Sequence, residues 1–292
     1  VRSTRGGGPA YDRDVVGTSF AAPKVARVAA RLQEVLLDES CLLYRALIVQ
    51  SARWPAWAEQ LDKPQKAALL RRIGFGIPDI QRATTNTDHR VTFLTYQDRT
   101  LGAGDCHIYQ VPIPPAMRSP ADAFDIRIDV TLSYAASPRR TRRSLRGYLA
   151  TWLDWTNNRK GESLEAFLSR ALKTEEDVTN EGEGQLGWIL HEKPIWGLPG
   201  IKRSVGTVQK DWAVVKSHAL PDDLCIAVRG HQGWSRDPDS VATYALVVTL
   251  EIVGQEIQIY EPLRAAVDDL RAEVEGEVEA ELELETPLEL DQ

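Results

Sequence analysis

Apolar residues recur at helical spacing near the start of the chain. Val25, Val28, Leu32 and Val35 follow one another at intervals of three or four residues, with alanines between them. So many alanines predict a helix that packs closely on several sides. Pro23 would lie in the first turn of this helix, where its missing N–H is harmless. The pattern therefore predicts a buried helix that begins near residue 19.

Two more helices are expected before residue 88. Ser40 is a typical N-cap residue ahead of the apolar run CLLYRALIVQSA (residues 41–52). A third helical run extends from Pro64 to Ile73 and ends at Gly74. The following stretch, GFGIPDI, is typical of a turn and a short extended piece.

The period changes to two after residue 90. Phe124, Ile126, Ile128, Val130 and Leu132 alternate with Asp, Arg and Thr, which predicts a half-buried strand. Further short strands are predicted at 91–97, 106–113, 148–155, 211–217, 224–229 and 241–253. Strands of this kind favour an antiparallel sandwich or barrel, with residues 157–185 as an insertion that contains a helix.

Composition and charge narrow the class of protein. The 292 residues are 43% hydrophobic and 26% charged, a globular balance without a transmembrane stretch. The net charge is -7, but residues 261–292 alone hold 12 acidic and 2 basic residues. The remaining body is slightly basic, so nothing draws the whole molecule to nucleic acid. We expect residues 263–292 to form a helix to about residue 270 and then an acidic, disordered tail.

The number and spacing of the three cysteines, at positions 41, 106 and 225, match neither a disulfide framework nor a zinc site. They give a mild preference for a reducing compartment. The first residues contain no signal peptide, but the chain starts at Val1 and its one methionine is Met117, so that absence says little.

The stretch Gly17-Thr18-Ser19-Phe20-Ala21-Ala22-Pro23 is the part of the sequence that suggests chemistry. A serine at the start of a buried helix lies among unpaired backbone N–H groups, at the positive end of the helix dipole. Such a site stabilises the oxyanion of a tetrahedral intermediate in acyl transfer. The ordinary alternative is that Ser19 is only an N-cap.

GTSFAAP resembles the nucleophile motif of the subtilases, G-T-S-x-A-x-P, at all five fixed positions: Gly17, Thr18, Ser19, Ala21 and Pro23. Residues 41–52 and 74–83 are similar to the next family segments, in the same order. The resemblance implies that Ser19 is the nucleophile, with its backbone N–H as an oxyanion donor and Thr18 as support. It also implies an α/β domain with a parallel sheet, of which residues 1–88 would be the C-terminal part.

The subtilase triad runs in the order Asp, His, Ser. The residues before Ser19 include Asp12 and Asp14 but neither histidine nor asparagine. We therefore expect a C-terminal fragment of a longer protease, which lacks the histidine and aspartate of the triad and is inactive alone. A substitute base from His218 or His231, which flank Asp222 and Asp223, is a less favoured possibility.

Other signals have ordinary explanations. Five arginines between residues 138 and 146 favour a solvated loop over a nucleic-acid site. The eight tryptophans favour core anchoring, with a binding surface as the alternative. Some subtilases bind calcium, but no residue spacing here identifies a ligand. No organic cofactor is expected.

The β region, including GTVQKDWAVV, resembles the C-terminal domain of bacterial subtilases that are found beside AAA-type ATPases in suspected phage-defence loci. This resemblance implies a jelly-roll-like accessory domain at residues 89–262, a cytoplasmic setting and a possible AAA-type ATPase partner. The leading function is a serine endopeptidase that cuts proteins or peptides through an acyl-enzyme at Ser19. The alternative is a non-catalytic module whose β domain recognises a protein partner or substrate.

Overall fold

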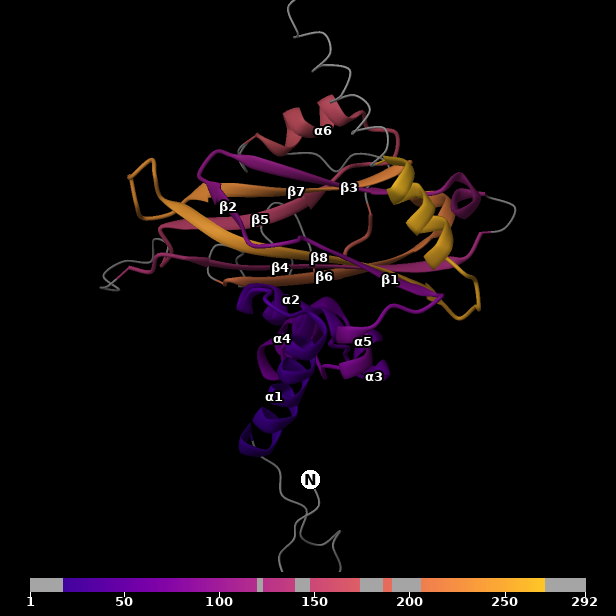
Figure 1. The fold of residues 1–292 in the computed structure, drawn as a ribbon, viewed down its shortest axis with the longest axis horizontal. Coiled ribbons are helices and arrows are strands. Elements are labelled where there is room, and N and C mark those ends of the chain that lie inside the picture. Colours follow the sequence, from indigo (N-terminus) through magenta and orange to yellow (C-terminus); the bar gives the residue numbers. More distant parts are fainter. Residues whose placement is uncertain (1–17, 120–122, 140–147, 174–185, 191–205, 271–292) are drawn as a thin grey trace, which may run out of the picture.

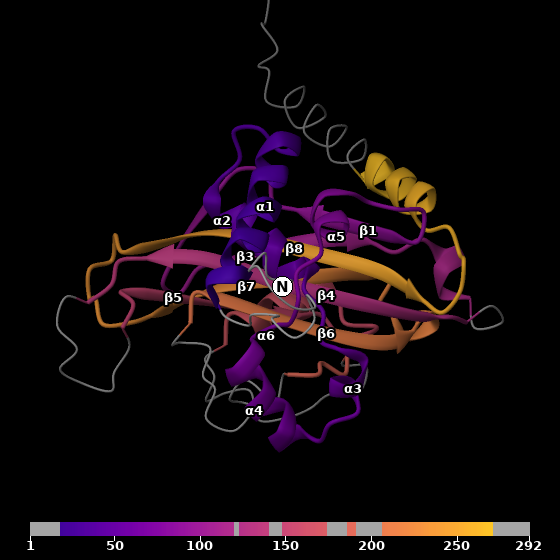
Figure 2. The ribbon, with the colours of Figure 1, turned by 90° about the horizontal axis from the view of Figure 1, so that it is seen from below.

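The computed structural model describes residues 18–119, 123–139, 148–173, 186–190 and 206–270. Two antiparallel sheets face each other, as Figure 1 shows. Helices α1 to α5 lie beneath one sheet and α6 lies above the other. Viewed from below, α2 lies beneath the sheet, whereas α3 and α4 reach past its edge on the side of β6 (Figure 2). No described helix is long and apolar enough to cross a membrane.

Five helices come first in the chain: α1 (Thr18–Val35), α2 (Cys41–Ser51), α3 (Ala56–Glu59), α4 (Lys63–Ile73) and α5 (Ile80–Thr84). The Ser40 hydroxyl accepts a hydrogen bond from the Leu43 backbone N–H, as expected of an N-cap. Helix α4 starts with a capping box formed by Asp62 and Gln65 and ends at Gly74, whose φ is 57°. The helices predicted at 41–52 and 64–73 are confirmed.

The first sheet has the order β1-β8-β4-β6, with β2 also paired to β8, and the second has the order β3-β7-β5. Their bounds are β1 (Arg90–Leu94), β2 (Arg99–Gly102), β3 (Cys106–Pro112), β4 (Asp125–Ala136), β5 (Thr151–Asn157), β6 (Val208–Lys216), β7 (Asp223–Gln232) and β8 (Val241–Val253). All predicted strands are present, and β2 was not predicted. Helix α6 (Leu164–Ala171) lies in the predicted insertion, and residues 260–270 are helical after β8.

The main hydrophobic core lies between the two sheets. Ile128 on β4 is aligned with Leu250 on β8 and Ala213 on β6, and all three are fully buried. Trp155 and Val228 reach the same core from the opposite sheet. The alternating apolar positions of the sequence therefore line the interior of the sandwich, as the period of two predicts.

The prediction that β4 is half-buried is wrong. Its polar positions are as inaccessible as its apolar ones: Asp129 and Thr131 are 0% exposed and Arg127 is 8% exposed. Helix α2 covers this outer face of the sheet, since Gln50 contacts both Asp129 and Thr131. Both faces of β4 are therefore buried, one by the second sheet and the other by a helix.

The prediction that the first helix packs on several sides is also wrong for the described residues. Only Val28 and Leu32 of α1 are buried, and its first half extends away from the sheets (Figure 1). Pro23 lies at the sixth position of α1 rather than in its first turn, so the Ser19 carbonyl lacks the helical N–H donor it would otherwise meet.

Every described strand pair is antiparallel. The parallel sheet expected from the resemblance stays a prediction, as do the jelly-roll connections and the domain boundaries. The end of the predicted acidic tail, residues 271–292, lies outside the described residues.

Candidate active site

Ser19 is the second residue of α1 and is exposed. The first four backbone N–H groups of a helix have no partner within the helix, and they create a positive end. Ser19 thus combines an accessible hydroxyl with nearby free N–H donors. Within the described part of the chain, no side-chain hydrogen bond or ion pair involves Ser19.

The other residues of the motif that the structure describes lie in α1 and are exposed to solvent. Thr18 is the first residue of α1 and is exposed, whereas Gly17 lies outside the described residues. Pro23 is exposed within the helix, as are Ala21 and Ala22. Small exposed side chains along this part of α1 leave room for another protein surface to approach the Ser19 end closely.

Helix α1 is anchored only by its second half. Val28 and Leu32 pack against Leu43 and Leu47 of α2, and Ala83 of α5 joins the same cluster. Ser19 precedes Val28 by nine residues, which is about 13 Å along a helix. The candidate nucleophile therefore lies at the end of α1 that is exposed, whereas the other end packs against the rest of the described structure.

Helix α2, which anchors α1, is itself held by a buried lysine of the β region. Lys210 on β6 is 1% exposed, and its Nζ donates to the backbone carbonyls of Val49, Gln50 and Ala52 at 3.1, 2.9 and 2.6 Å. These carbonyls are at the C-terminus of α2, where helical partners are missing. Burial lowers the pKa of Lys210 to about 7, although the Asp129 carboxylate 3.6 Å away opposes that shift.

Asp129 on β4 is the buried carboxylate that compensates these positive charges. Its Oδ1 accepts from Arg53 at 2.8 Å, and its Oδ2 accepts from Arg127 at 2.9 Å. Burial alone would raise the pKa of Asp129, but Lys210 and the two arginines outweigh it, so the pKa is lowered. The carboxylate is therefore ionised and pairs with cations from the segment after α2, from β4 and from β6 together.

A second carboxylate extends this network to α5. Glu251 on β8 accepts from Arg53 at 2.9 Å and from Arg82 at 2.6 Å. Burial of Glu251 favours the neutral acid, yet these two guanidinium groups hold its pKa below the usual value. The segments that follow α1 are therefore tied to the sheet by charges as well as by apolar contacts.

The described histidines do not serve Ser19. His231 pairs through Nε2 with Asp154 at 2.8 Å and stacks on Trp152, on the sheet that lies away from α1. Asp222 pairs with Arg118, and among the described residues no hydrogen bond or ion pair joins Asp222 to His218 or His231. The other two, at positions 89 and 107, contact Ile257 and Tyr244, and His191 lies outside the described residues. The less favoured substitute base is therefore not supported.

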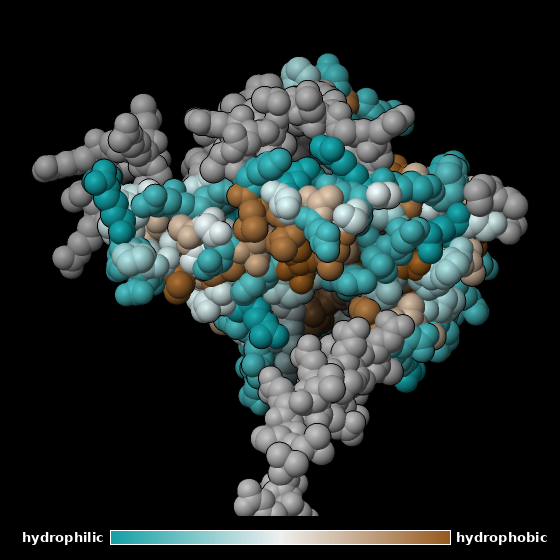
Figure 3. All heavy atoms as spheres, turned by 90° about the horizontal axis from the view of Figure 1, so that it is seen from above, coloured by the Kyte–Doolittle hydropathy of each residue, from teal (hydrophilic) through white to brown (hydrophobic). Residues whose placement is uncertain are grey.

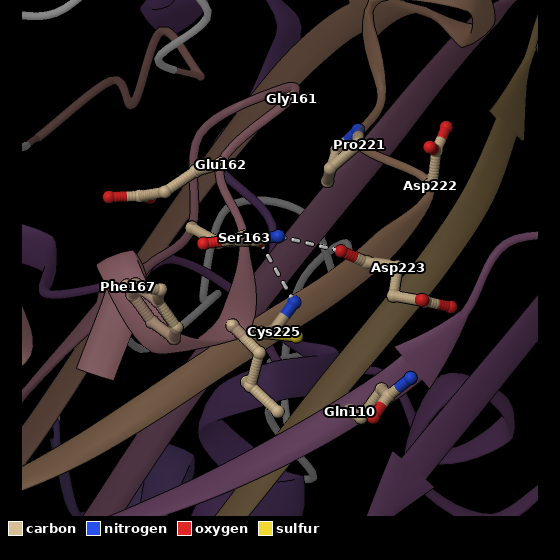
Figure 4. Close-up of a pocket in the computed structure, with 11 residues that line it drawn as sticks. Gln110, Gly161, Glu162, Ser163, Phe167, Pro221, Asp222, Asp223 and Cys225 are labelled. Atoms are coloured by element: carbon tan, nitrogen blue, oxygen red, sulfur yellow. Dashed lines mark hydrogen bonds between the residues drawn. The ribbon is translucent and has the colours of Figure 1, made fainter.

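Two surface pockets flank α6, on the side of the sandwich opposite α1. One, of about 380 Å³, is lined by Gln110, Ser163, Phe167 and Asp223 among others (Figure 4). Glu162 points to the opposite side of this pocket from Asp223. The other, of about 310 Å³, is lined by Lys173, Arg229 and His231 and by apolar residues such as Ala171. Because they lie across the sandwich from α1, neither pocket belongs to the Ser19 site.

The structure also bears on the tryptophans, the possible metal ligands and the cysteines. Four tryptophans anchor cores as predicted, at positions 54, 155, 188 and 212, whereas Trp57 and Trp234 are exposed. The arginine-rich stretch lies largely outside the described residues, as does Trp196. The described residues contain no group of three or more potential metal ligands. The described structure holds no disulfide, and all three cysteines are free.

Sequence reasoning missed the ion network around Asp129. Its only trace is a set of charged residues in strands that are otherwise strongly apolar, such as Arg127 and Asp129 in IRIDVTL and Lys210 in VQKDWAVV. A charge in such a strand normally faces water when one sheet face is solvated. These charged residues are buried because helix α2 covers the outer face of the sheet.

The family comparison bears on the first quarter of the chain. A model of the Subtilase family matches residues 7–76, which include the GTSFAAP motif and helices α1, α2, α3 and α4. A relative described as the uncharacterized protein y4bN, from Sinorhizobium fredii (strain NBRC 101917 / NGR234), is 29% identical over 255 residues.

That alignment covers 86% of this chain and 56% of the relative, so the chain spans little more than half of the relative's length. The relative's name states no activity. The family match therefore carries the functional indication, and it does so over a short region. Over residues 7–76 this chain is similar to the subtilases, a family of serine peptidases.

Proposed function

We propose that this chain carries the nucleophile of a subtilisin-like serine endopeptidase, which hydrolyses peptide bonds through an acyl-enzyme at Ser19. The observation that carries the proposal is the exposed position of Ser19 at the start of α1, inside the segment that matches the Subtilase family. An accessible hydroxyl beside the N–H groups at a helix start supplies two of the groups that acyl transfer requires, a nucleophile and oxyanion donors.

Each motif residue has a part in the proposed reaction. The Ser19 hydroxyl attacks the substrate carbonyl, and the backbone N–H groups at the start of α1 stabilise the oxyanion that forms. In this proposal Gly17, which precedes the helix, and Thr18, its first residue, support the nucleophile and its oxyanion donors. Pro23 withdraws one donor from the helix, so the Ser19 carbonyl is free of its usual helical bond.

The general base and its orienting acid come, in this proposal, from a histidine and an aspartate upstream of the segment described. The rings of His89, His107 and His231 hydrogen-bond to residues other than Ser19, and without a base a serine hydroxyl is a poor nucleophile. Removal of the serine or the histidine from such a triad lowers turnover on the order of 10⁶-fold. The 292-residue chain alone is therefore expected to be inactive.

A fluorophosphonate probe, which labels only activated serines, tests the proposal on two proteins. The 292-residue chain should remain unlabelled. The product translated from the upstream coding sequence should be labelled at Ser19, and Ser19→Ala should abolish labelling. Ser169→Ala is the matched control, because Ser169 is also an exposed serine on a helix. An extended product that contains the upstream histidine and aspartate but resists the probe contradicts the endopeptidase proposal.

The second candidate is an interaction module whose β region recognises a protein partner or substrate, with the AAA-type ATPase as one such partner. The exposed leucines of α6 and the two pockets beside it favour this candidate. An upstream sequence without the triad histidine and aspartate would select it over the peptidase.

A further inference from the structure

Strand β3 is an edge strand of the second sheet, whose order is β3-β7-β5. Ile113 donates its backbone N–H to the Asp222 carbonyl in register with β7, so the odd-numbered residues of β3 direct their backbone groups towards β7. The even-numbered residues direct theirs to the other side. Among the described residues, no backbone group pairs there with Cys106, Ile108 or Gln110. An unpaired edge of this kind accepts an additional strand.

Helix α6 overhangs this edge with the part of its apolar stripe that the sheet does not cover. Phe167 and Ala171 are buried against β7, and on one flank of them Arg170 donates to the Asn157 carbonyl of β5. The opposite flank therefore lies towards β3. It carries three leucines that are each at least 40% exposed: Leu164, Leu168 and Leu172. Hydrophobic side chains gather near the middle of this side of the molecule (Figure 3).

The two pockets beside α6 lie between these leucines and the ends of β3. Leu164 and Gln110 both line the pocket of about 380 Å³. Leu172 lines the pocket of about 310 Å³ together with Asp105, which precedes β3. An apolar flank with a pocket at each end thus runs beside the unpaired backbone groups of β3. This combination fits an extended segment in which every second side chain is apolar.

The C-terminal part of this chain contains such a segment. Residues 278–284 read VEAELEL, in which Glu alternates with apolar residues, and these seven residues match the length of β3. Glu disfavours isolated strands, so the segment needs an edge to pair with. Leu263, in the helix that precedes the tail, packs in the same core cluster as Val111 of β3. The linker of residues 271–277 can span about 23 Å when extended.

We propose that residues 278–284 bind the free edge of β3 as an added antiparallel strand of the same chain. Pairing Leu282 with Ile108 places Leu284 opposite Cys106, and the apolar side chains then lie on the face that carries the exposed leucines of α6. The proposal does not depend on the function of Ser19. A partner that uses this surface must first displace the tail.

The same register matches the charges. Glu281 lies opposite Tyr109, on the face of the sheet that looks away from α6. Arg99 of β2 is aligned with Tyr244, whose hydroxyl is 2.5 Å from that of Tyr109. Within the described part of the chain, no ion pair involves the exposed Arg99. The row of glutamates therefore faces a cation that has no other carboxylate partner there.

Cross-linking tests the register. In a Cys41→Ser background, Leu284→Cys should form an intramolecular disulfide with Cys106 under mild oxidation, because the Cα atoms of hydrogen-bonded pairs on neighbouring strands are about 5.5 Å apart. Leu290→Cys, in the same tail but outside the segment, is the matched control and should react at least about tenfold more slowly. Glu283→Cys, whose side chain points to the other face, should also react slowly. Equal rates at positions 284 and 290, or a bridge that joins two copies, overturn the proposal.

Hydrogen exchange tests the pairing without a cross-link. In the full chain the backbone N–H groups of Cys106, Ile108 and Gln110 should exchange slowly, because carbonyl groups of the tail accept hydrogen bonds from them. Leu282→Asp should speed their exchange at least about tenfold, whereas Leu290→Asp should leave it unchanged. Both substitutions leave the two sheets unaltered, so the contrast reports contact with the tail. Equal exchange of these three groups in the two variants overturns the proposal.

Discussion

The two faces of β4 are equally buried and chemically opposite. Its inner face is a row of apolar side chains, such as Ile128, that pack against the second sheet. Its outer face holds Arg127 and Asp129, which lie under α2 and join Arg53 and Lys210 from two other segments. Burial of the inner face needs only matched shapes, whereas burial of the outer face needs every charge to have a partner.

This difference affects how the Ser19 helix is held. Helix α1 rests on α2, and α2 rests on the outer face of the sheet, where Lys210 closes its C-terminus. Among the described residues, the inner face of β4 packs into the core between the two sheets and does not contact these helices. The outer face therefore links the β region to the segment that carries the candidate nucleophile, through these charges and through the apolar contacts of Ala245 and Val247 on β8 with the helices.

The largest expected effect comes from removing the carboxylate of the outer face. Asp129→Ala leaves Lys210, Arg53 and Arg127 without their shared anion, so we expect the free energy of unfolding to fall by about 3–5 kcal/mol. Urea unfolding at pH 7 measures it. Asp125→Ala is the matched control on the same strand, because Asp125 pairs with Lys216 at the surface and should cost less than about 1 kcal/mol. If both variants lose the same free energy of unfolding, the buried network stabilises the fold no more than a surface ion pair does.

A somewhat smaller loss in the free energy of unfolding is expected when an apolar residue of the inner face of β4 is truncated. Ile128→Ala removes buried methyl groups from a fully enclosed position, which costs about 3 kcal/mol. The same urea titration compares it with Val214→Ala, an exposed position expected to lie within about 0.5 kcal/mol of the unmodified chain. A larger loss for Ile128→Ala than for Asp129→Ala would reverse the ranking of the two faces.

The smallest effect at neutral pH is expected at Lys210, and it should depend on pH. Lys210→Met removes the hydrogen bonds to the α2 carbonyls but also removes the cost of burying an ammonium group, so we expect a loss of about 1–2 kcal/mol at pH 7. Asp129, Arg53 and Arg127 face the amine in the unmodified protein.

The folded pKa of Lys210 is lowered to about 7 from the ordinary 10.5. Between these pH values the unfolded chain binds more protons than the folded one, so the stability of the unmodified protein rises with pH in this window. The difference from Lys210→Met should therefore grow from pH 7 to pH 10, as chemical unfolding at several pH values would show. A difference that is constant or shrinks over that range contradicts the lowered pKa.

Local patterns predicted the elements well, because a repeat of 3.6 or 2 residues and a cap are properties of adjacent residues. Ser40 and Gly74 mark the ends of helices as expected, and the alternation from Phe124 to Leu132 is a strand. The strand β2 escaped prediction because four residues are too few to show a period. The burial of Asp129 escaped it because burial depends on what covers the other face.

The sequence alone determined the order and type of the elements and the motif that holds Ser19, since each depends on neighbouring residues. Only the tertiary structure decided that α2 closes the polar face of β4, that α1 projects from the body, and that His231 pairs with Asp154 on the far sheet. Those facts depend on contacts between residues far apart in the chain, and a local pattern of polar and apolar positions does not specify which distant surface meets it.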